Sequence, residues 1–270
     1  MIVGIDIGGS TTDAVTIENG GLHVVTIEAN DPVAAAAGAL GKLVAEFNLR
    51  LEDVERVAAT GAGSRALSDR LLGRPVVKVN EFTAIGVGGT SLTHRDEALV
   101  VSLGTGTAIV SVKRGKIAHF SGTGVGGGTL LGLAKHMLGV VTIERLEALA
   151  KNGDLHRVDL TVRDIAGGPI GDLPPQTTAA NFGKLSADAT AEDKALAIMN
   201  MITESIAQLA LASARACRQE NIVLTGKLSR LFTFMQQMKR LEFAFSRGFL
   251  IPEHADYATA IGAARTALKC

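Results

Sequence analysis

Three short clusters of glycine and hydroxyl residues constrain the fold of this chain more than any other feature. They read DIGGSTT from Asp6 to Thr12, LGTGT from Leu103 to Thr107, and GVGGG from Gly124 to Gly128. The first two follow short apolar stretches that are typical of strands. Glycine makes up 31 of the 270 residues, against a usual share of about 7%. Its concentration in loops indicates backbone that approaches a ligand closely, rather than a disordered linker.

The first two clusters belong to a weak internal repeat. Aligning Gly8 with Gly104 places IDIGGSTTDAV over VSLGTGTAIV. Each copy predicts a strand, a glycine turn, a strand, a hairpin and a further strand, with helices later. The hairpin signals are Asn19-Gly20-Gly21 in the first copy and Arg114-Gly115 in the second. The repeat predicts an α/β fold of two lobes, residues 1–90 and 91–270, with a cleft between them. This layout resembles the actin-like (ribonuclease H-like) ATPase and sugar-kinase superfamily.

Helices are predicted between these strands. Asp31 caps a helix with Pro32 in its first turn, which runs to about Phe47. A second helix is predicted over residues 64–73, and a third begins at about Glu81. An apolar helix follows the GVGGG cluster, and a long amphipathic helix covers about residues 192–218. Residues 248–252 are predicted as a strand. The terminal helix, residues 255–268, is expected to pack back toward the first lobe.

The overall charge and composition exclude several classes of function. The chain has 27 basic and 27 acidic residues, so no basic excess is present to neutralise nucleic-acid phosphates. Aromatic residues make up only 4% and tryptophan is absent, which argues against base stacking. No apolar run reaches the roughly 18 residues that span a bilayer. The N-terminal sequence lacks the basic region of a signal peptide. We therefore expect a cytoplasmic protein that binds neither nucleic acid nor a membrane.

The glycine clusters are suited to binding phosphate. Glycine leaves backbone N–H groups open to phosphate oxygens, and the neighbouring hydroxyls add donors. The first two loops are expected to face each other and hold the triphosphate of ATP, while the third begins a helix, where anions are favoured. Asp6 is a candidate ligand for Mg²⁺, although it could simply end a strand. The predicted phosphate-binding residues are Gly8, Gly9, Ser10, Thr11, Gly104, Thr105, Gly106, Thr107, Gly126, Gly127 and Gly128.

A rival motif overlaps the third cluster. Gly122, Gly124 and Gly127 match the G-x-G-x-x-G pattern of dinucleotide-binding proteins, and Glu144 follows about 20 residues later. A hairpin precedes this pattern, however, and no clear parallel strand follows its helix. The alternative of a dinucleotide-binding oxidoreductase is therefore the weaker one. No Gly-Lys-Ser/Thr sequence is present, which excludes a classical P-loop.

Glu81 is the candidate catalytic base. It follows the predicted strand at residues 76–79, and active-site groups of α/β sheets gather at the carboxyl ends of strands. A carboxylate there could accept the proton of a substrate hydroxyl that attacks a γ-phosphate. The alternative is that Glu81 only stabilises the N-terminus of a helix through its dipole.

At these residues the chain resembles the type II (eukaryote-like) pantothenate kinases. The resemblance covers nearly the whole length and rests on GIDIGG, NEF, LGTGT, GTGVGGGTLLGL, GDLHRVDLTVRDI, TAANFGK, ENIVLTG and the final AIGA. It implies Mg²⁺-dependent transfer of the ATP γ-phosphate to a primary hydroxyl in coenzyme A biosynthesis, with Glu81 as the base. It also implies a homodimer formed through the long helix, and inhibition by coenzyme A or acyl-coenzyme A in the same cleft. Asn181 joins the substrate pocket by the same resemblance.

Several positions depart from the family pattern. His119 stands where the family usually has an arginine in the substrate pocket, and Ser102 where it often has an asparagine. Asp13 replaces a frequent lysine, and Ala108 a hydroxyl residue. Because pantothenate carries a carboxylate, loss of a permanent cation removes a charge-assisted pair, which histidine restores only when protonated. An uncharged relative such as pantetheine is therefore compatible with the pocket.

Two classes of function remain open. The first is a kinase that phosphorylates a small molecule. The second is a non-catalytic relative, either an ATPase module that activates a partner enzyme or a sensor of nucleotide or coenzyme A. Glu81 favours the kinase. The apolar stripe of the long helix favours a homodimer, and the alternative is a core helix buried within one chain.

Overall fold

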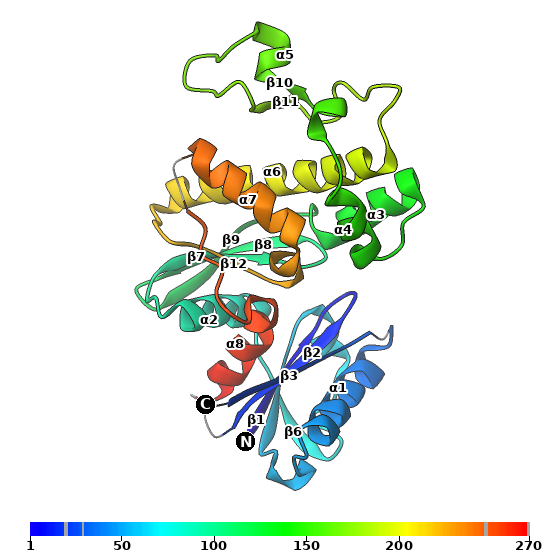
Figure 1. The fold of residues 1–270 in the computed structure, drawn as a ribbon. Coiled ribbons are helices and arrows are strands. Elements are labelled where there is room, and N and C mark those ends of the chain that lie inside the picture. Colours follow the sequence, from blue (N-terminus) through cyan, green and yellow to red (C-terminus); the bar gives the residue numbers. More distant parts are fainter. Residues whose placement is uncertain (19–20, 29, 246–247, 269–270) are drawn as a thin grey trace.

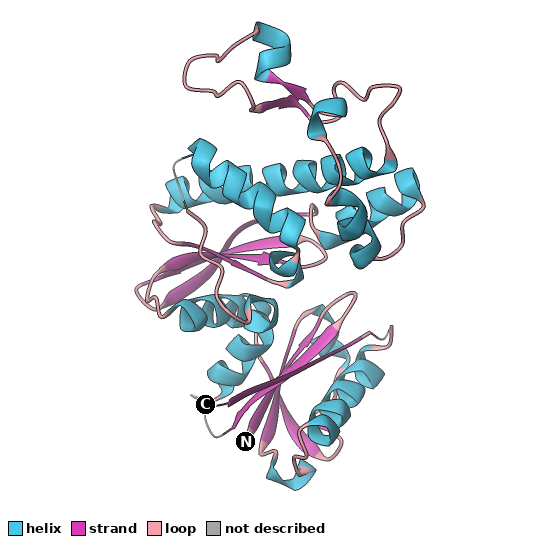
Figure 2. Ribbon diagram, viewed as in Figure 1, coloured by secondary structure: helices cyan, strands magenta, loops and turns pink. Residues whose placement is uncertain are grey.

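Two β-sheets, each with helices on both faces, form the two lobes seen in the computed structural model (Figures 1 and 2). The structure describes residues 1–18, 21–28, 30–245 and 248–268. The sheet of the first lobe has the strand order β3-β2-β1-β4-β6-β5, and that of the second has the order β12-β7-β8-β9. The first sheet consists of β1 (Ile2–Ile7), β2 (Thr12–Glu18), β3 (Gly21–Ile27), β4 (Arg56–Thr60), β5 (Arg70–Leu71) and β6 (Arg74–Lys78). The second consists of β7 (Ala98–Leu103), β8 (Thr107–Lys113), β9 (Lys116–Thr123) and β12 (Ile222–Thr225).

The predicted repeat is confirmed by the way these strands pair. In the first lobe β1 pairs antiparallel with β2 and parallel with β4. In the second lobe β7 pairs antiparallel with β8 and parallel with β12. The turn between β8 and β9 has positive φ angles at Arg114 (50°) and Gly115 (73°), as a tight two-residue hairpin requires. The turn predicted at Asn19-Gly20 lies outside the described residues.

Helices cover both faces of each sheet, and the inner helices lie between the two sheets. In the first lobe α1 packs on one face and α8 on the other, and in the second lobe α2 lies on the face opposite α6 and α7 (Figure 1). Asp31 Oδ1 accepts a hydrogen bond from the N–H of Ala34 (2.7 Å), which confirms the predicted cap of α1. The helices are α1 (Pro32–Glu46), α2 (Glu81–Thr93), α3 (Gly127–Leu138), α4 (Ile143–Ala150), α5 (Val162–Ala166), α6 (Ala191–Cys217), α7 (Phe232–Phe245) and α8 (Ala258–Ala267).

Helices α2 and α8 join the lobes at very close range. A Cβ atom added to Gly88 of α2 would lie 1.9 Å from the carbonyl oxygen of Ala258, and one added to Gly262 of α8 would lie 1.9 Å from that of Ala84. Only glycine permits this approach. Helix α8 also packs on β1 and β4, which confirms that the terminal helix returns to the first lobe. The boundary placed near residue 90 falls inside α2, a helix that contacts both lobes.

Two predicted elements differ in the structure. Residues 64–73 do not form a helix. A 3₁₀ turn at Ala62–Ala66 is followed by β5, which pairs with β6 through a turn at Leu72 (φ 47°) and Gly73 (φ 80°). The helical spacing arises because Leu67 and Leu71 both face the core. Residues 248–252 are not a strand either, and only a single bridge joins Leu250 to Val223 of β12.

Helix α6 buries its apolar stripe inside the second lobe. Ile198, Ile202 and Ile206 are at most 1% exposed and belong to the same core as Leu99 of β7. Among the described residues α6 is the one helix long and apolar enough to cross a membrane, and its burial is that of a core helix. The stripe alone therefore gives no reason for a second subunit.

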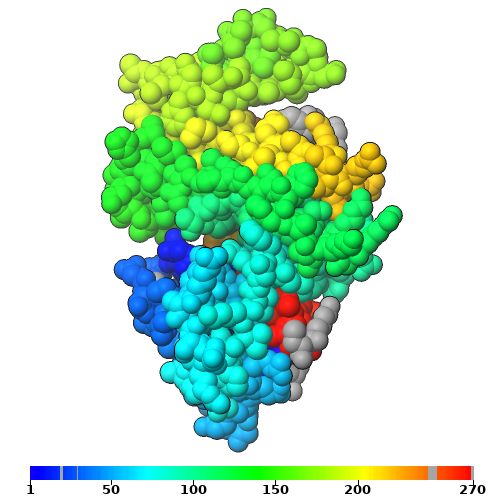
Figure 3. Space-filling model, turned by 180° about the vertical axis from the view of Figure 1, so that it is seen from behind, coloured from blue at the N-terminus to red at the C-terminus, as the bar shows by residue number. Residues whose placement is uncertain are grey.

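A small unit projects from the second lobe beyond α6. It contains α5 and the two short strands β10 (Leu160–Thr161) and β11 (Thr178–Ala180). Figure 3 shows it as a yellow-green knob at the end of the molecule away from the first lobe. Asp159, 1% exposed, anchors it by accepting hydrogen bonds from Asn200 Nδ2 of α6 (2.8 Å) and from the N–H of Phe182 (2.9 Å).

Candidate functional site

The first two glycine loops are tight turns that face each other across the lobes. The N–H of Gly8 donates to the carbonyl of Thr11 (3.0 Å), and that of Gly104 to the carbonyl of Gly106 (2.9 Å). A Cβ atom added to Gly9 would lie 3.5 Å from Thr105 Oγ1, so the two turns meet as predicted. Ser10 and Thr105 are both exposed. Their hydroxyls and the loop backbone can therefore bind an anion placed between the lobes.

The third glycine loop has a different role from the predicted one. The N–H groups of Gly127 and Gly128 donate to the carbonyls of Gly104 and Thr105, each over 2.9 Å. A Cβ atom added to Gly126 would lie 2.7 Å from Thr105 O. These two N–H groups at the start of α3 are thus bound by the second loop and are not available to a phosphate. Thr107 is likewise occupied, because its hydroxyl donates to the carbonyl of Val125 (2.8 Å). These residues fix the shape of the second loop.

A row of polar side chains crosses the first sheet beneath the loops. Thr60, Asp6, Asp13 and Thr26 occupy neighbouring positions on β4, β1, β2 and β3, and such cross-strand neighbours lie side by side on one face. Burial, the charge of Asp13 and the charge of Glu81 together raise the pKa of Asp6 to about 7, and Lys227 opposes this rise. Burial also raises the pKa of Asp13, again opposed by Lys227.

The surroundings of Asp6 fit a hard cation. Thr60 Oγ1, in the neighbouring position on β4, is buried and has no hydrogen-bond partner. A carboxylate with a free hydroxyl oxygen beside it offers the oxygen ligands that Mg²⁺ prefers. The described residues contain no group of three or more acidic, histidine or cysteine side chains that could hold a metal by themselves. A metal here would therefore take most of its ligands from phosphate oxygens and water, as Mg²⁺ does in kinases.

Glu81 is joined to His119 through the residue that follows it in the chain, Phe82. Glu81 is the first residue of α2, follows β6 and is exposed. The next residue, Phe82, stacks on the ring of His119 from β9, with 4.2 Å between the ring centroids and 23° between the planes. The structure thus places the predicted pocket residue His119 against the neighbour of the candidate base. Glu81 is also close enough to Asp6 for its charge to affect the pKa of Asp6.

Two predicted residues remain: Ser102 lies near the cleft and Asn181 lies away from it. Ser102 is the penultimate residue of β7, in the position of the second lobe that corresponds to Asp6 in the first, and pairs across strands with Thr225. Asn181 lies in the projecting unit, where its Nδ2 donates to Glu204 Oε2 of α6 (3.0 Å). Helix α6 separates it from the sheet that carries the loops (Figure 1). The structure does not bring Asn181 to the other predicted residues, because it anchors the unit to α6.

The rival dinucleotide motif does not have the required setting. Gly122 lies in β9, which runs antiparallel to β8, and Gly127 begins α3. No parallel strand is paired with β9 among the described residues. The pattern is therefore not part of a βαβ unit, which is the context that the dinucleotide fingerprint needs.

Lys227 is a residue of the cleft that the sequence analysis missed. It begins the 3₁₀ turn Lys227–Arg230 after β12, and its Nζ donates to Asp13 Oδ1 (2.7 Å) and to Thr26 Oγ1 (3.1 Å) of the first lobe. A sequence signal for it exists. The motif T-G-x-x-S-R occurs at residues 60–65, after β4, and again at residues 225–230, after β12. Both copies form the same turn, with φ of 83° at Gly61 and 92° at Gly226.

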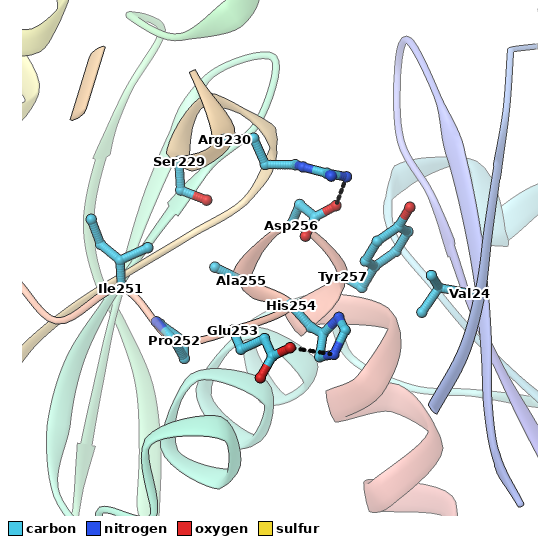
Figure 4. Close-up of a pocket in the computed structure, with 10 residues that line it drawn as sticks. All are labelled: Val24, Ser229, Arg230, Ile251, Pro252, Glu253, His254, Ala255, Asp256 and Tyr257. Carbon is cyan, nitrogen blue, oxygen red and sulfur yellow. Dashed lines mark hydrogen bonds and ion pairs between the residues drawn. The ribbon is translucent and has the colours of Figure 1, made fainter. Parts of the chain in front are cut away.

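The turn that carries Lys227 also borders a cavity at the junction of the lobes (Figure 4). The cavity has a volume of about 440 Å³ and is formed by this turn, by residues 251–257 and by Val24 of β3. Arg230 lies along its edge and binds Asp256 Oδ2 through NH1 (2.9 Å). The Tyr257 ring lies 4.4 Å below Lys227 Nζ. Charged groups of both lobes therefore meet around this turn.

Comparison with known proteins gives matches over most of the chain. A model of the Fumble family matches residues 91–266. The type II pantothenate kinase of Oceanobacillus iheyensis is 31% identical over 276 aligned residues, which cover 97% of this chain and 97% of that protein.

Solved structures confirm the predicted fold class. The activator of 2-hydroxyisocaproyl-CoA dehydratase from Clostridium difficile, with bound ADPNP, has a TM-score of 0.74 at 19% identity and covers 99% of this chain and 94% of that one. A ROK family glucokinase from Streptomyces griseus, in complex with glucose and AMPPNP, has a TM-score of 0.61 at 16% identity and covers 100% and 99%. At these identities the similarity concerns the fold, which is that of the actin-like ATPases and sugar kinases.

Proposed function

The chain belongs to the Fumble family of type II pantothenate kinases, and we propose that it transfers the γ-phosphate of ATP to a primary hydroxyl of pantothenate or a close relative such as pantetheine. This reaction is a step of coenzyme A biosynthesis. The observation that carries the proposal is the 31% identity to a type II pantothenate kinase over 97% of the chain. The two facing glycine loops and the exposed carboxylate of Glu81 supply the groups that such a reaction needs.

In the proposed reaction Glu81 accepts the proton of the acceptor hydroxyl. The hydroxyl oxygen forms a bond to the γ-phosphorus while the bond from that phosphorus to the β-γ bridging oxygen breaks, and ADP leaves with the electron pair. The loops at Gly8–Thr11 and Gly104–Gly106 hold the phosphates between the lobes. Glu81 follows β6 of the sheet that carries Asp6 on β1, so the proposed base and the proposed metal contact belong to the same lobe.

Asp6, with Thr60 beside it, is the proposed protein contact of Mg²⁺. The metal, when bound, neutralises the charge that develops on the β- and γ-phosphate oxygens. The role of the protein residues is to orient it. Asp6 must be ionised to do so, because a protonated carboxyl group is a poor metal ligand.

The raised pKa of Asp6 predicts a pH dependence of metal binding. Because this pKa is about 7 in the empty protein, Asp6 is mostly neutral below that pH and mostly ionised above it. Binding of Mg²⁺ with ATP should therefore tighten as the pH rises through about 7, and should release a proton at pH 6.5. Calorimetry in two buffers of different ionisation enthalpy measures that proton.

The Asp6→Asn variant is the control for this prediction. It should bind ATP with a weaker dependence on magnesium and should release no proton. Wild-type binding of Mg²⁺ with ATP at pH 6.5 without proton release would contradict the assignment of Asp6. A rise in the melting temperature with NAD but not with ATP would contradict the nucleotide site as a whole.

The acceptor is tested by following ADP release with a coupled assay. We expect ADP to form when ATP and Mg²⁺ are combined with pantothenate or pantetheine, and to form much more slowly without an acceptor. If ADP were released at the same rate with and without an acceptor, the ATPase-module alternative would be favoured.

We further propose that coenzyme A or acyl-coenzyme A competes with ATP for the cleft, and that the protein works in the cytoplasm.

We propose a homodimer, for which the family resemblance is the support. The apolar side chains that remain exposed on the projecting unit include Ile165 (62%), Ile170 (49%) and Leu173 (45%), and we propose that a second copy covers them. Light scattering should then give twice the chain mass of 28.0 kDa. The double variant Ile165→Asp/Ile170→Asp should become monomeric, whereas Val141→Asp, at an equally exposed position (66%), should not. A monomeric wild type at micromolar concentration would contradict the dimer.

A further inference from the structure

Lys227 is placed where the three glycine loops and both lobes converge. A Cβ atom added to Gly226 would lie 2.5 Å from the carbonyl oxygen of Leu103, directly before the second loop. On the other side, Leu228 Cδ2 would lie 3.7 Å from a Cβ atom added to Gly127 in the third loop. The Lys227 side chain reaches Asp13, the second residue of the strand that follows the first loop. The ammonium group of a second-lobe residue thus contacts the sheet of the first lobe.

The ammonium group of Lys227 is held by two hydrogen bonds, which do not use all of its N–H donors. It has three N–H donors, and two of them bind Asp13 Oδ1 and Thr26 Oγ1. Thr26 Oγ1 in turn donates to Asp13 Oδ1 (2.5 Å). The other acidic neighbour, Asp256 Oδ2, is 4.0 Å away, which is too far for a hydrogen bond. The Lys227 side chain is 35% exposed, whereas that of Asp13 is only 8% exposed. The third donor has no hydrogen-bond acceptor among the described residues. The Tyr257 ring lies 4.4 Å from Nζ, and the side chain is partly open to solvent.

From this arrangement we infer that Lys227 is a nucleotide-binding residue that donates a charge-assisted hydrogen bond to a phosphate oxygen of ATP. Asp13 and Thr26 are its positioning residues, since they hold the ammonium group beside the loops before the nucleotide arrives. The cation comes from the second lobe, and the carboxylate of Asp13 in the first lobe is its anchor.

The repeated T-G-x-x-S-R motif supports a role specific to the second lobe. The two turns share the glycine with positive φ, and Ser64 and Ser229 each donate to the carbonyl of that glycine over 2.7 Å. The position of Lys227 is occupied in the first lobe by Ala62. A lysine is thus not needed to form this turn, so the role of Lys227 lies in what its side chain contacts.

The inference rests on the nucleotide site of the proposed function and is tested by nucleotide binding without an acceptor. Calorimetry with ATP, ADP and adenosine, in the presence and absence of Mg²⁺, gives the affinities. Lys227→Met should weaken ATP and ADP binding by about 10- to 100-fold, the effect of one hydrogen bond to a charged group. Adenosine binding should change by less than about twofold, because it has no phosphate. Lys227→Arg should recover part of the lost affinity for ATP.

Lys184→Met is the matched control. Lys184 is 32% exposed and its Nζ binds Asp164 Oδ1 over 2.9 Å, so the substitution breaks a similar ion pair, but in the projecting unit. It should leave all three affinities unchanged. Equal losses for adenosine and ATP in Lys227→Met, or no loss for ATP, would overturn the inference.

The Asp13→Asn variant distinguishes two roles of Lys227: binding of a phosphate, and an ion pair that only joins the lobes. If Lys227 binds phosphate, this variant should bind ATP at least as tightly as the wild type, since the amide Oδ1 of asparagine still accepts the positioning hydrogen bond while the ammonium group no longer shares its charge with a carboxylate. A loss of ATP affinity as large as that of Lys227→Met would show that the ion pair only joins the lobes. This variant also decides the matter if Lys227→Met fails to fold. A wild type that binds no ATP would instead overturn the proposed function.

Discussion

Replacing Glu81 with glutamine should lower kcat by about 10²-fold or more, the usual scale of general-base catalysis. The amide keeps the size of the side chain and cannot accept the proton of the acceptor hydroxyl. The affinity for ATP should stay nearly unchanged, because Glu81 is not part of the loops that are proposed to hold the phosphates. Steady-state kinetics with saturating acceptor, together with calorimetric titration of ATP, measures both quantities.

A matched variant tests whether Glu81 acts only on the helix dipole. Glu144 is also exposed and lies in the first turn of a helix, α4, so Glu144→Gln removes the same favourable interaction with a helix N-terminus. It should leave kcat unchanged. If Glu81→Gln retained more than about a third of the wild-type kcat, as Glu144→Gln should, then Glu81 would have only the structural role.

The second large effect concerns the identity of the acceptor. His119→Arg should raise kcat/KM for pantothenate by about tenfold or more, since a guanidinium forms a permanent charge-assisted pair with the carboxylate of that acceptor. Pantetheine has no carboxylate and should gain little. The position of His119, stacked on the residue that follows Glu81, keeps the new cation near the proposed base. The kcat/KM values of both acceptors, measured in wild type and variant, test this.

A second histidine provides the control for this substitution. His136 is exposed on α3, outside the cleft, and His136→Arg should change neither value. Efficient wild-type use of pantothenate, unaffected by His119→Arg, would show that the departure at this position is neutral. The ordinary acceptor of the family would then apply without change.

The parts of the fold that depend on local sequence could be predicted. The strand and turn at Asp6–Thr12 and the capped helix after Asp31 follow from neighbouring residues, and the repeat of the first pattern at Leu103 predicted the second lobe. The exception is residues 64–73, where leucines with helical spacing, Leu67 and Leu71, face the core from a turn and a short strand. Tertiary packing there outweighed a local preference for helix.

The parts of the site that depend on distant contacts could not be predicted in the same way. Lys227 meets Asp13 over a separation of 214 residues, and nothing near either residue indicates that contact. The N–H groups of Gly127 and Gly128 looked free at a helix start, but the second loop satisfies them. Asn181 was included by resemblance alone, and its position depends on how the projecting unit is anchored to α6. Each of these outcomes follows from the packing of elements that are far apart in the sequence.

The most direct test of the central claim is the stoichiometry of the reaction products. Purified protein with ATP, Mg²⁺ and pantothenate or pantetheine should yield one phosphorylated acceptor for every ADP, with the acceptor mass raised by one phosphoryl group in mass spectrometry. Glu81→Gln should form both products at the same reduced rate. ADP that accumulates without a phosphorylated acceptor would contradict a kinase and would identify the protein as an ATPase that uses the same fold.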